Sequence, residues 1–160
     1  MEVETETRKG YKKTKLGWIP ENWRIQKLGG FCKITSGGTP NRDNKSFWDE
    51  GEIPWITTSL INFNIINKAE QFITEKGLEN SSTKLFPKGT ILLALYGQGF
   101  TRGKVSVLGL RAATNQACAA ILLESEEVDN VFLFYALAFQ YNRLRNLSND
   151  GGQKNLSGGL

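Results

Sequence analysis

The 160-residue sequence contains no histidine. Histidine is the commonest general base and the commonest metal ligand in proteins, and it is the base in Ser-His and Cys-His catalytic arrangements. Its absence removes the most frequent routes to hydrolytic and metal-assisted catalysis. Only two cysteines are present, Cys32 and Cys118, each within an apolar stretch. They cannot assemble a zinc site, and we expect buried thiols in a reducing compartment.

Sequence motifs for cofactor binding are also missing. There is no Gly-Lys-Ser/Thr phosphate loop, and there is no Asp/Asn-Pro-Pro-aromatic motif of the kind a DNA amino-methyltransferase needs. The glycine-rich stretch 97–103 leads into a second strand-like run, so it offers no helix N-terminus for a phosphate. Paired carboxylates beside a lysine, as a metal-dependent nuclease requires, are not evident either. We therefore expect a chain without catalysis that binds no cofactor or metal.

No segment is suited to a membrane. The longest apolar run, Val131–Phe139, is far shorter than the roughly 20 residues that span a bilayer, and the N-terminus lacks an apolar signal core. A cytoplasmic protein with no membrane contact is expected. Residues 1–15 are polar and unpatterned, which predicts a mobile lead-in. Residues 16–160 are long enough to form one domain with its own core.

Charge is distributed unevenly, although the net charge is only +4. Between Arg8 and Lys33 there are eight Lys and Arg residues and one acid, whereas 49–79 carries six acids and two lysines. From Asn80 to Leu123 there are five basic residues and no Asp or Glu. A polar loop inside such an acid-free window is suited to a polyanion.

Two loops and one turn carry side chains that suit nucleic acid. Arg and Lys pair with guanine edges, and Asn and Gln pair bidentately with adenine. Hydroxyls and further cations position a phosphate backbone. The candidate residues are Ser36, Thr39, Arg42 and Lys45 in one loop, Gln98, Thr101, Arg102 and Lys104 in a glycine-rich hairpin, and Asn115 and Gln116 after it.

Each of these features also has a plain structural interpretation. The glycine-rich stretch is equally typical of a hairpin connection. Asn115 suits a turn that feeds a buried strand, and Trp48 and Trp55 suit core packing better than stacking on bases. The stretch 81–84 suits a capped helix end better than a phosphate clamp.

The pattern of hydrophobic residues predicts an α+β fold: a twisted, mostly antiparallel sheet with one long C-terminal helix and extended loops. Residues 24–28 and 32–35 are expected as short strands, or as a strand and a short helix. Further predicted strands are 53–58, 72–74, 90–96, 103–108 and 116–123, with a helical turn at 75–80. Asp129 can cap a helix running to about Leu147, whose first half is apolar on every side.

Several segments, in order, resemble the target recognition domains of type I restriction-modification specificity subunits. They are Leu16-Gly-Trp-Ile-Pro-Glu-Asn-Trp, Ile34-Thr-Ser-Gly-Gly-Thr-Pro, Ile53-Pro-Trp-Ile-Thr-Thr, Leu85-Phe-Pro-Lys-Gly-Thr, Tyr96-Gly-Gln-Gly-Phe-Thr-Arg-Gly-Lys-Val, Ala113-Thr-Asn-Gln-Ala and Gly152-Gln-Lys-Asn-Leu. The last segment adds Lys154 to the candidate DNA-contacting residues.

This resemblance implies a domain that reads one half of a two-part double-stranded DNA target, beside methylation and restriction subunits. S-adenosylmethionine, ATP and magnesium would belong to those subunits. The fold would be similar to the recognition domains of DNA adenine methyltransferases. Family specificity subunits carry two recognition domains joined by long helices, whereas this sequence holds one. It is therefore a fragment, an excised domain or a natural half-subunit, and a half-subunit would be expected to self-associate.

Two other functions fit the sequence less directly. The acidic blocks and the apolar helix would suit a protein-interaction module that docks a methylation subunit. A fragment of a catalytic DNA methyltransferase would need the motifs that are missing.

Overall fold

The computed structural model describes residues 8–97 and 99–146, which divide into two units, Met1–Gly30 and Phe31–Leu160. In the first unit, β1 (Tyr11–Thr14) pairs antiparallel with β2 (Gly17–Pro20), and the 3-10 helix η1 spans Leu28–Gly30. β1 lies where an unpatterned lead-in was predicted. The hairpin forms there through main-chain pairing and the Thr14 hydroxyl, which donates to the Gly17 carbonyl at 2.8 Å. Residues 24–27 form no strand.

The second unit contains a five-stranded sheet in the order β3-β11-β8-β9-β5. These strands are β3 (Cys32–Ser36), β5 (Ile65–Ile66), β8 (Ile91–Ala94), β9 (Val105–Leu108) and β11 (Cys118–Leu123). All neighbours are antiparallel except β5 and β9. The four longer strands were predicted: β8, β9 and β11 from runs rich in apolar residues between turn signals, and β3 from the alternation of polar and apolar residues.

A second sheet of four short strands has the order β6-β4-β10-β7. They are β4 (Ile53–Ile56), β6 (Gln71–Ile73), β7 (Leu85–Phe86) and β10 (Ala112–Thr114). β4 and β10 are parallel, and the other two pairs are antiparallel. A mostly antiparallel α+β fold is thus confirmed, but with two sheets in this unit instead of one.

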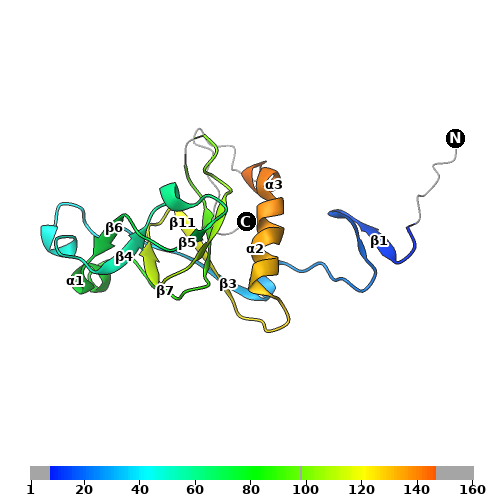
Figure 1. The fold of residues 1–160 in the computed structure, drawn as a ribbon, viewed down its shortest axis with the longest axis horizontal. Coiled ribbons are helices and arrows are strands. Elements are labelled where there is room, and N and C mark those ends of the chain that lie inside the picture. Colours follow the sequence, from blue (N-terminus) through cyan, green and yellow to red (C-terminus); the bar gives the residue numbers. More distant parts are fainter. Residues whose placement is uncertain (1–7, 98, 147–160) are drawn as a thin grey trace. The chain divides into compact units, whose positions relative to one another are not determined.

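The core lies between the two sheets. Ile56 and Phe86 of the four-stranded sheet pack with Leu92, Leu108 and Ala120 of the five-stranded sheet, and all five are buried. The outer face of the four-stranded sheet is covered by α1 (Glu75–Glu79) and the 3-10 helix η2 (Lys45–Phe47). A further 3-10 helix, η3, spans Thr58–Leu60. Figure 1 shows these layers in sequence, with α2 on the far side of the five-stranded sheet.

The single long helix predicted from Asp129 to Leu147 is wrong in one respect. Asp129 does cap it, accepting from the Phe132 amide at 2.8 Å, but α2 ends at Phe139 and α3 spans Tyr141–Asn146. Between them Gln140 has ψ of 8°, outside the α-helical region. Leu147 lies outside the described residues. α2 buries only Leu133 and Leu137 fully, so its apolar character is not explained by burial on several faces.

Candidate nucleic-acid interface

Strand register gathers the predicted loops at one end of the five-stranded sheet. Ser36 lies opposite Ala119, Cys118 opposite Ala94, and Leu93 opposite Val105. The C-terminal ends of β3 and β8 therefore lie beside the N-terminal ends of β11 and β9. The 36–45 loop, the 95–104 loop and the 115–117 turn all leave from this end, which we call the loop end. β5 runs parallel to β9, so the preceding residues 61–64 join it.

The 36–45 loop is fixed to the end of β10 by a buried hydrogen-bond network. The Gly38 amide donates to the Thr114 carbonyl at 2.9 Å, and the Thr83 hydroxyl donates to the Gly38 carbonyl at 2.6 Å. At the surface, the Thr39 hydroxyl donates to Oε1 of the exposed Gln116 at 2.6 Å. Two predicted residues that are 77 positions apart in sequence are thus in direct contact.

Gly37 explains why this loop can approach Thr114, at the end of β10, so closely. A Cβ at this position would lie 1.9 Å from the Thr114 carbonyl oxygen, a distance that no side chain tolerates. Nearby, exposed Ser36 ends β3, and the Lys84 ammonium donates to the Thr35 hydroxyl at 2.7 Å. Lys84 therefore adds a cation to the loop end that was not among the candidate residues.

Asn115 is occupied in shaping a turn. Its Oδ1 accepts from the Ala117 amide and from the Cys118 thiol, both at 3.2 Å. This geometry matches the turn that feeds a buried strand, the structural alternative considered for this residue. Burial raises the pKa of the Cys118 thiol to about 12, so the thiol stays protonated and remains a donor.

Arg42 and Lys45 are placed differently from the other candidates. The Arg42 guanidinium lies 3.8 Å from the ring centre of Trp48 and 4.7 Å from that of Trp55, a cation–π arrangement. Lys45 is exposed in η2, beside α1. Both therefore lie over the outer face of the four-stranded sheet. Trp55 is buried, as expected for core packing, and the two tryptophan rings meet edge to face at 5.1 Å.

In the 95–104 loop the candidate side chains are anchored. Thr101, Arg102 and Lys104 are all half-buried. The Lys104 ammonium donates to Asn62 Oδ1 at 2.7 Å and lies 5.9 Å from the ring centre of Phe63. The Lys104 side chain is therefore held against the segment that precedes β5. Gln98 and Lys154 lie outside the described residues.

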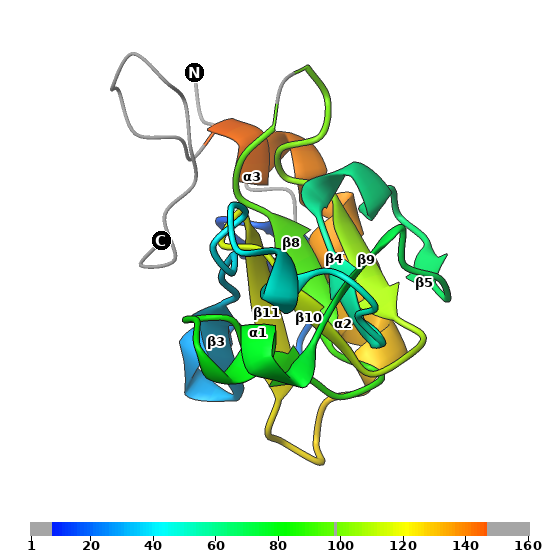
Figure 2. The same cartoon turned by 90° about the vertical axis from the view of Figure 1, so that its left-hand side faces the viewer.

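Helix α3 adds residues to the loop end that the sequence did not reveal. The Tyr141 hydroxyl donates to the Phe100 carbonyl at 2.6 Å, and Arg145 donates to the carbonyls of Gly99 at 2.9 Å and Arg102 at 3.0 Å. Figure 1 and Figure 2 both show the loop beside α3. No local sequence signal links Arg145 to a loop that lies 43 and 46 positions earlier at its two hydrogen-bond acceptors.

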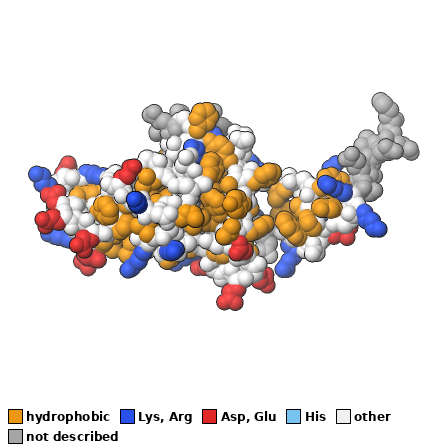
Figure 3. Space-filling model, viewed as in Figure 1, with side chains coloured by type: hydrophobic (Ala, Val, Ile, Leu, Met, Phe, Trp, Pro, Cys, Tyr) orange, Lys and Arg blue, Asp and Glu red, His pale blue; other side chains and the backbone are white. Residues whose placement is uncertain are grey.

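The loop end is positively charged. Residues 57–67, 95–104 and 141–146 contain no Asp or Glu, and Asp43 is the one acid in the 36–45 loop. On the face seen in Figure 3, no acidic side chain lies over the loop between β8 and β9, while acidic groups gather near α1 and below β3. Such a distribution favours an anionic ligand at this end.

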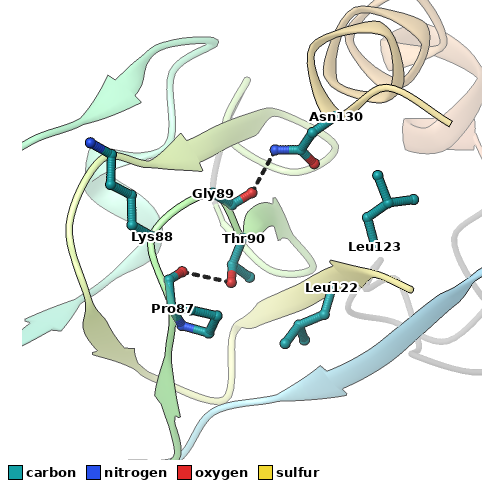
Figure 4. A pocket seen from close by; sticks show the side chains of 7 residues that line it. All are labelled: Pro87, Lys88, Gly89, Thr90, Leu122, Leu123 and Asn130. Atoms are coloured by element: carbon teal, nitrogen blue, oxygen red, sulfur yellow. Dashed lines mark hydrogen bonds between the residues drawn. The ribbon is translucent and has the colours of Figure 1, made fainter. Parts of the chain in front are cut away.

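A small depression of about 240 Å³ lies away from the loop end and is shown in Figure 4. Its polar groups already bond to one another: Asn130 donates to the Gly89 carbonyl and Thr90 to the Pro87 carbonyl, each at 2.8 Å. The Lys88 ammonium points away from it. Over residues 8–97 and 99–146, no cluster of metal-binding side chains occurs and no helix is long and apolar enough to cross a bilayer.

Comparison with known proteins shows that this fold is shared by solved specificity subunits. The HsdS subunit from Thermoanaerobacter tengcongensis superposes with a TM-score of 0.62 at 16% identity, over 92% of this chain and 35% of that one. A chain from a structure on complex assembly and conformational transition of the type I R-M system gives 0.64, also at 16% identity, over 88% and 32%.

In sequence, the chain belongs to the family described as the type I restriction modification DNA specificity domain, whose model matches residues 20–159. One curated relative is the specificity subunit of type I restriction enzyme MjaIX from Methanocaldococcus jannaschii. It is 34% identical over 128 residues, which cover 78% of this chain and 28% of the relative. This chain thus spans about a third or less of the relatives' length.

Proposed function

We propose that this chain is a sequence-specific recognition domain for double-stranded DNA that reads one half of a two-part target. It carries out no catalysis itself. Methylation and restriction subunits of a type I complex supply the chemistry and bind S-adenosylmethionine, ATP and magnesium. The observation that carries the proposal is the strand register, which brings separate polar and basic loops to one end of a rigid sheet.

The chemistry at the loop end supports this function. Gln116 is exposed and can present its amide to a base edge, while the Thr39 hydroxyl fixes its orientation. Ser36 lies next to them, and Lys84 and Lys104 provide charge for phosphate contacts. Because the loops are fixed to buried strands, little conformational entropy is lost when they bind.

The expectation of methylation and restriction subunits as partners rests on the family to which the chain belongs. A single domain reads one half-site, so a second recognition domain, on another chain or on a second copy of this one, reads the other half. Joining two half-sites raises affinity without new contacts at either. We therefore expect the 160-residue chain alone to bind weakly.

The main alternative, a protein-interaction module with secondary DNA contacts, is not favoured. The family match is to a DNA specificity domain, and the loops that the strand register brings to the loop end contain basic residues and one acid, Asp43. A catalytic methyltransferase fragment is not supported, since the curated relatives are named as specificity subunits.

Selection from a random duplex library would test the proposal. The chain is mixed at about 50 mM salt with 30-base-pair duplexes, and bound DNA is sequenced over several rounds. We expect enrichment of a short continuous half-site, with dissociation constants for unselected duplex of ~10⁻⁴–10⁻⁶ M at physiological salt and lower at about 50 mM salt. Enriched and scrambled duplexes are then titrated side by side at two salt concentrations.

Two results would overturn it. One is the absence of any duplex binding at low salt by a chain whose circular dichroism and thermal melt show that it is folded. The other is binding without sequence enrichment, even after a methylation subunit is added. Analytical ultracentrifugation of the same samples determines whether two copies associate on DNA.

A further inference from the structure

Phe100 is held in an unusual position at the tip of the β8–β9 loop. Its side chain is 77% exposed, yet the main chain around it is hydrogen-bonded to α3. The Phe100 carbonyl accepts from the Tyr141 hydroxyl, and the carbonyls of Gly99 and Arg102 on either side accept from Arg145. The two α3 side chains also bond to each other at 3.2 Å. An aromatic ring is thus presented to solvent by a fixed backbone.

Two glycines permit this arrangement. Gly99 has φ of 60°, a left-handed conformation that side chains rarely adopt, and it precedes Phe100 directly. Gly103 has φ of 86°, and a Cβ there would lie 2.9 Å from Cγ of Arg145. Gly103 therefore lets the loop pack closely against α3, whereas Gly99 supplies the backbone conformation that precedes Phe100 and has no atom near its missing Cβ.

The surroundings of the ring are basic and aromatic. The Arg145 guanidinium lies 5.8 Å from the Phe100 ring centre. Phe63 is 39% exposed, has φ of 57° and packs edge to face on Tyr141 at 5.3 Å. Neither α3 nor the loops of Phe63 and Phe100 contain an acid. An apolar tip surrounded by cations suits bases flanked by phosphates, as in proteins that place apolar wedges between base steps.

We propose that Phe100 is an apolar wedge that packs against DNA bases, and that Tyr141 and Arg145 are positioning residues that fix the loop presenting it. The inference rests on the proposed DNA-recognition function and adds a specific contact to it. A wedge must already be ordered, because the energy it gains from base contact has to exceed the cost of unstacking. The three hydrogen bonds from α3 to the loop main chain provide that order.

Phe100 can be tested with DNA that reports unstacking. The probe is the enriched half-site duplex with single 2-aminopurine substitutions at successive positions. Wild-type chain should raise 2-aminopurine fluorescence at one step. Phe100→Ala should lose that signal and bind at least about tenfold more weakly, because a stacked aromatic is lost. Phe100→Trp should retain both.

Phe139→Ala is the matched control. Phe139 is 88% exposed on α2 and its removal deletes the same apolar side chain elsewhere on the second unit. Binding and fluorescence should equal wild type. Thermal melts of all variants should agree closely, since neither ring is buried.

The positioning role of Tyr141 and Arg145 can be tested by measuring how strongly each variant prefers the enriched duplex over a scrambled one. Tyr141→Phe removes one loop hydrogen bond without changing charge, so the salt dependence of binding should be unchanged. The ratio of dissociation constants for scrambled and enriched duplexes should fall about threefold to tenfold. Arg145→Lys keeps the charge but loses the planar fork that reaches two carbonyls, and should lower the ratio at least as much. A purely structural role would lower the melting temperature and leave this ratio unchanged.

The outcomes separate the two proposals. If the folded wild-type chain binds no duplex, the proposed function fails and the wedge with it. If wild type binds selectively and Phe100→Ala binds equally well with the same fluorescence, only the wedge is refuted. Unchanged selectivity in both Tyr141→Phe and Arg145→Lys would refute the positioning role.

Discussion

Two buried threonine hydroxyls beside the 36–45 loop differ in what they bond. The Thr83 hydroxyl donates toward the Gly38 carbonyl at 2.6 Å and also lies 3.1 Å from the Thr114 carbonyl. The Thr114 hydroxyl has no hydrogen-bond partner among the described residues. Thr83→Val should lower the free energy of unfolding by about 1–3 kcal/mol, whereas Thr114→Val should be neutral or stabilising. Urea unfolding of the two variants gives the comparison; equal losses would contradict the bonding pattern.

The raised pKa of the Cys118 thiol should make the stability of the folded chain depend on pH above pH 9. Its thiol has a pKa raised by burial from 9.0 to about 12, so the folded chain keeps a proton that the unfolded chain releases. This contribution is complete below pH 9 and is lost as pH rises toward 12, at up to about 1.4 kcal/mol per pH unit.

Cys118→Ala is the reference for this effect, since other groups titrate in the same range. The difference in unfolding free energy between wild type and variant should be constant from pH 7 to 8 and should shrink at pH 10. A difference that stays constant to pH 10 would show that the thiol is not desolvated.

For single residues, the sequence indicated which side chains are polar or basic but could not indicate which residues they contact. Gln116 suited hydrogen bonding, yet its partner Thr39 is 77 positions away. Arg42 was a candidate for phosphate contact, and its stacking on Trp48 could not be predicted because it depends on tertiary structure. Asn115 was open to two interpretations, and only the distances to Ala117 and Cys118 show the turn.

Among the elements, α2 offers a direct test of how the helix packs. Leu137 is 6% exposed and Phe139 is 88% exposed, although they are two residues apart. Leu137→Ala should destabilise the chain by about 2–5 kcal/mol through the cavity it leaves. Phe139→Ser should change stability by less than about 0.5 kcal/mol. Thermal and urea unfolding measure both; a large loss for Phe139→Ser would mean that this face of α2 is covered in the free chain.

Element prediction succeeded where runs of apolar residues were long. β8, β9 and β11 each carry three or more such positions between turns, and the capped start of α2 was also predicted. β5 and β7 have only two residues each, and pairing with neighbours defines them more than their own sequence does. The break at Gln140 was missed because no Pro or Gly marks it.

For the molecule as a whole, the salt dependence of DNA binding should depend on where the basic residues lie more than on how many there are. Lys104 lies at the loop end, whereas Lys88 precedes β8 and lies at the opposite end of the sheet. Replacing either by Met removes one charge and keeps an apolar stem. Lys104→Met should flatten the slope of log affinity against log salt by about 0.9, as expected for one lost phosphate contact, and Lys88→Met should leave it unchanged.

Fluorescence anisotropy with one duplex between 50 and 200 mM salt measures both slopes. Equal flattening in the two variants would indicate binding governed by net charge. An unchanged slope in Lys104→Met would remove this lysine from the interface.

The gathering of loops at one end of a sheet has a consequence for how such a chain evolves. The residues that fill the core, such as Leu92 and Leu108, lie along the strands, while Gln116 and Phe100 lie beyond their ends. Substitutions in the loops therefore cost little stability, apart from fixed points such as Gly37. Selection for a new ligand and selection for a folded chain act on largely separate residues, so a lineage can change one without losing the other.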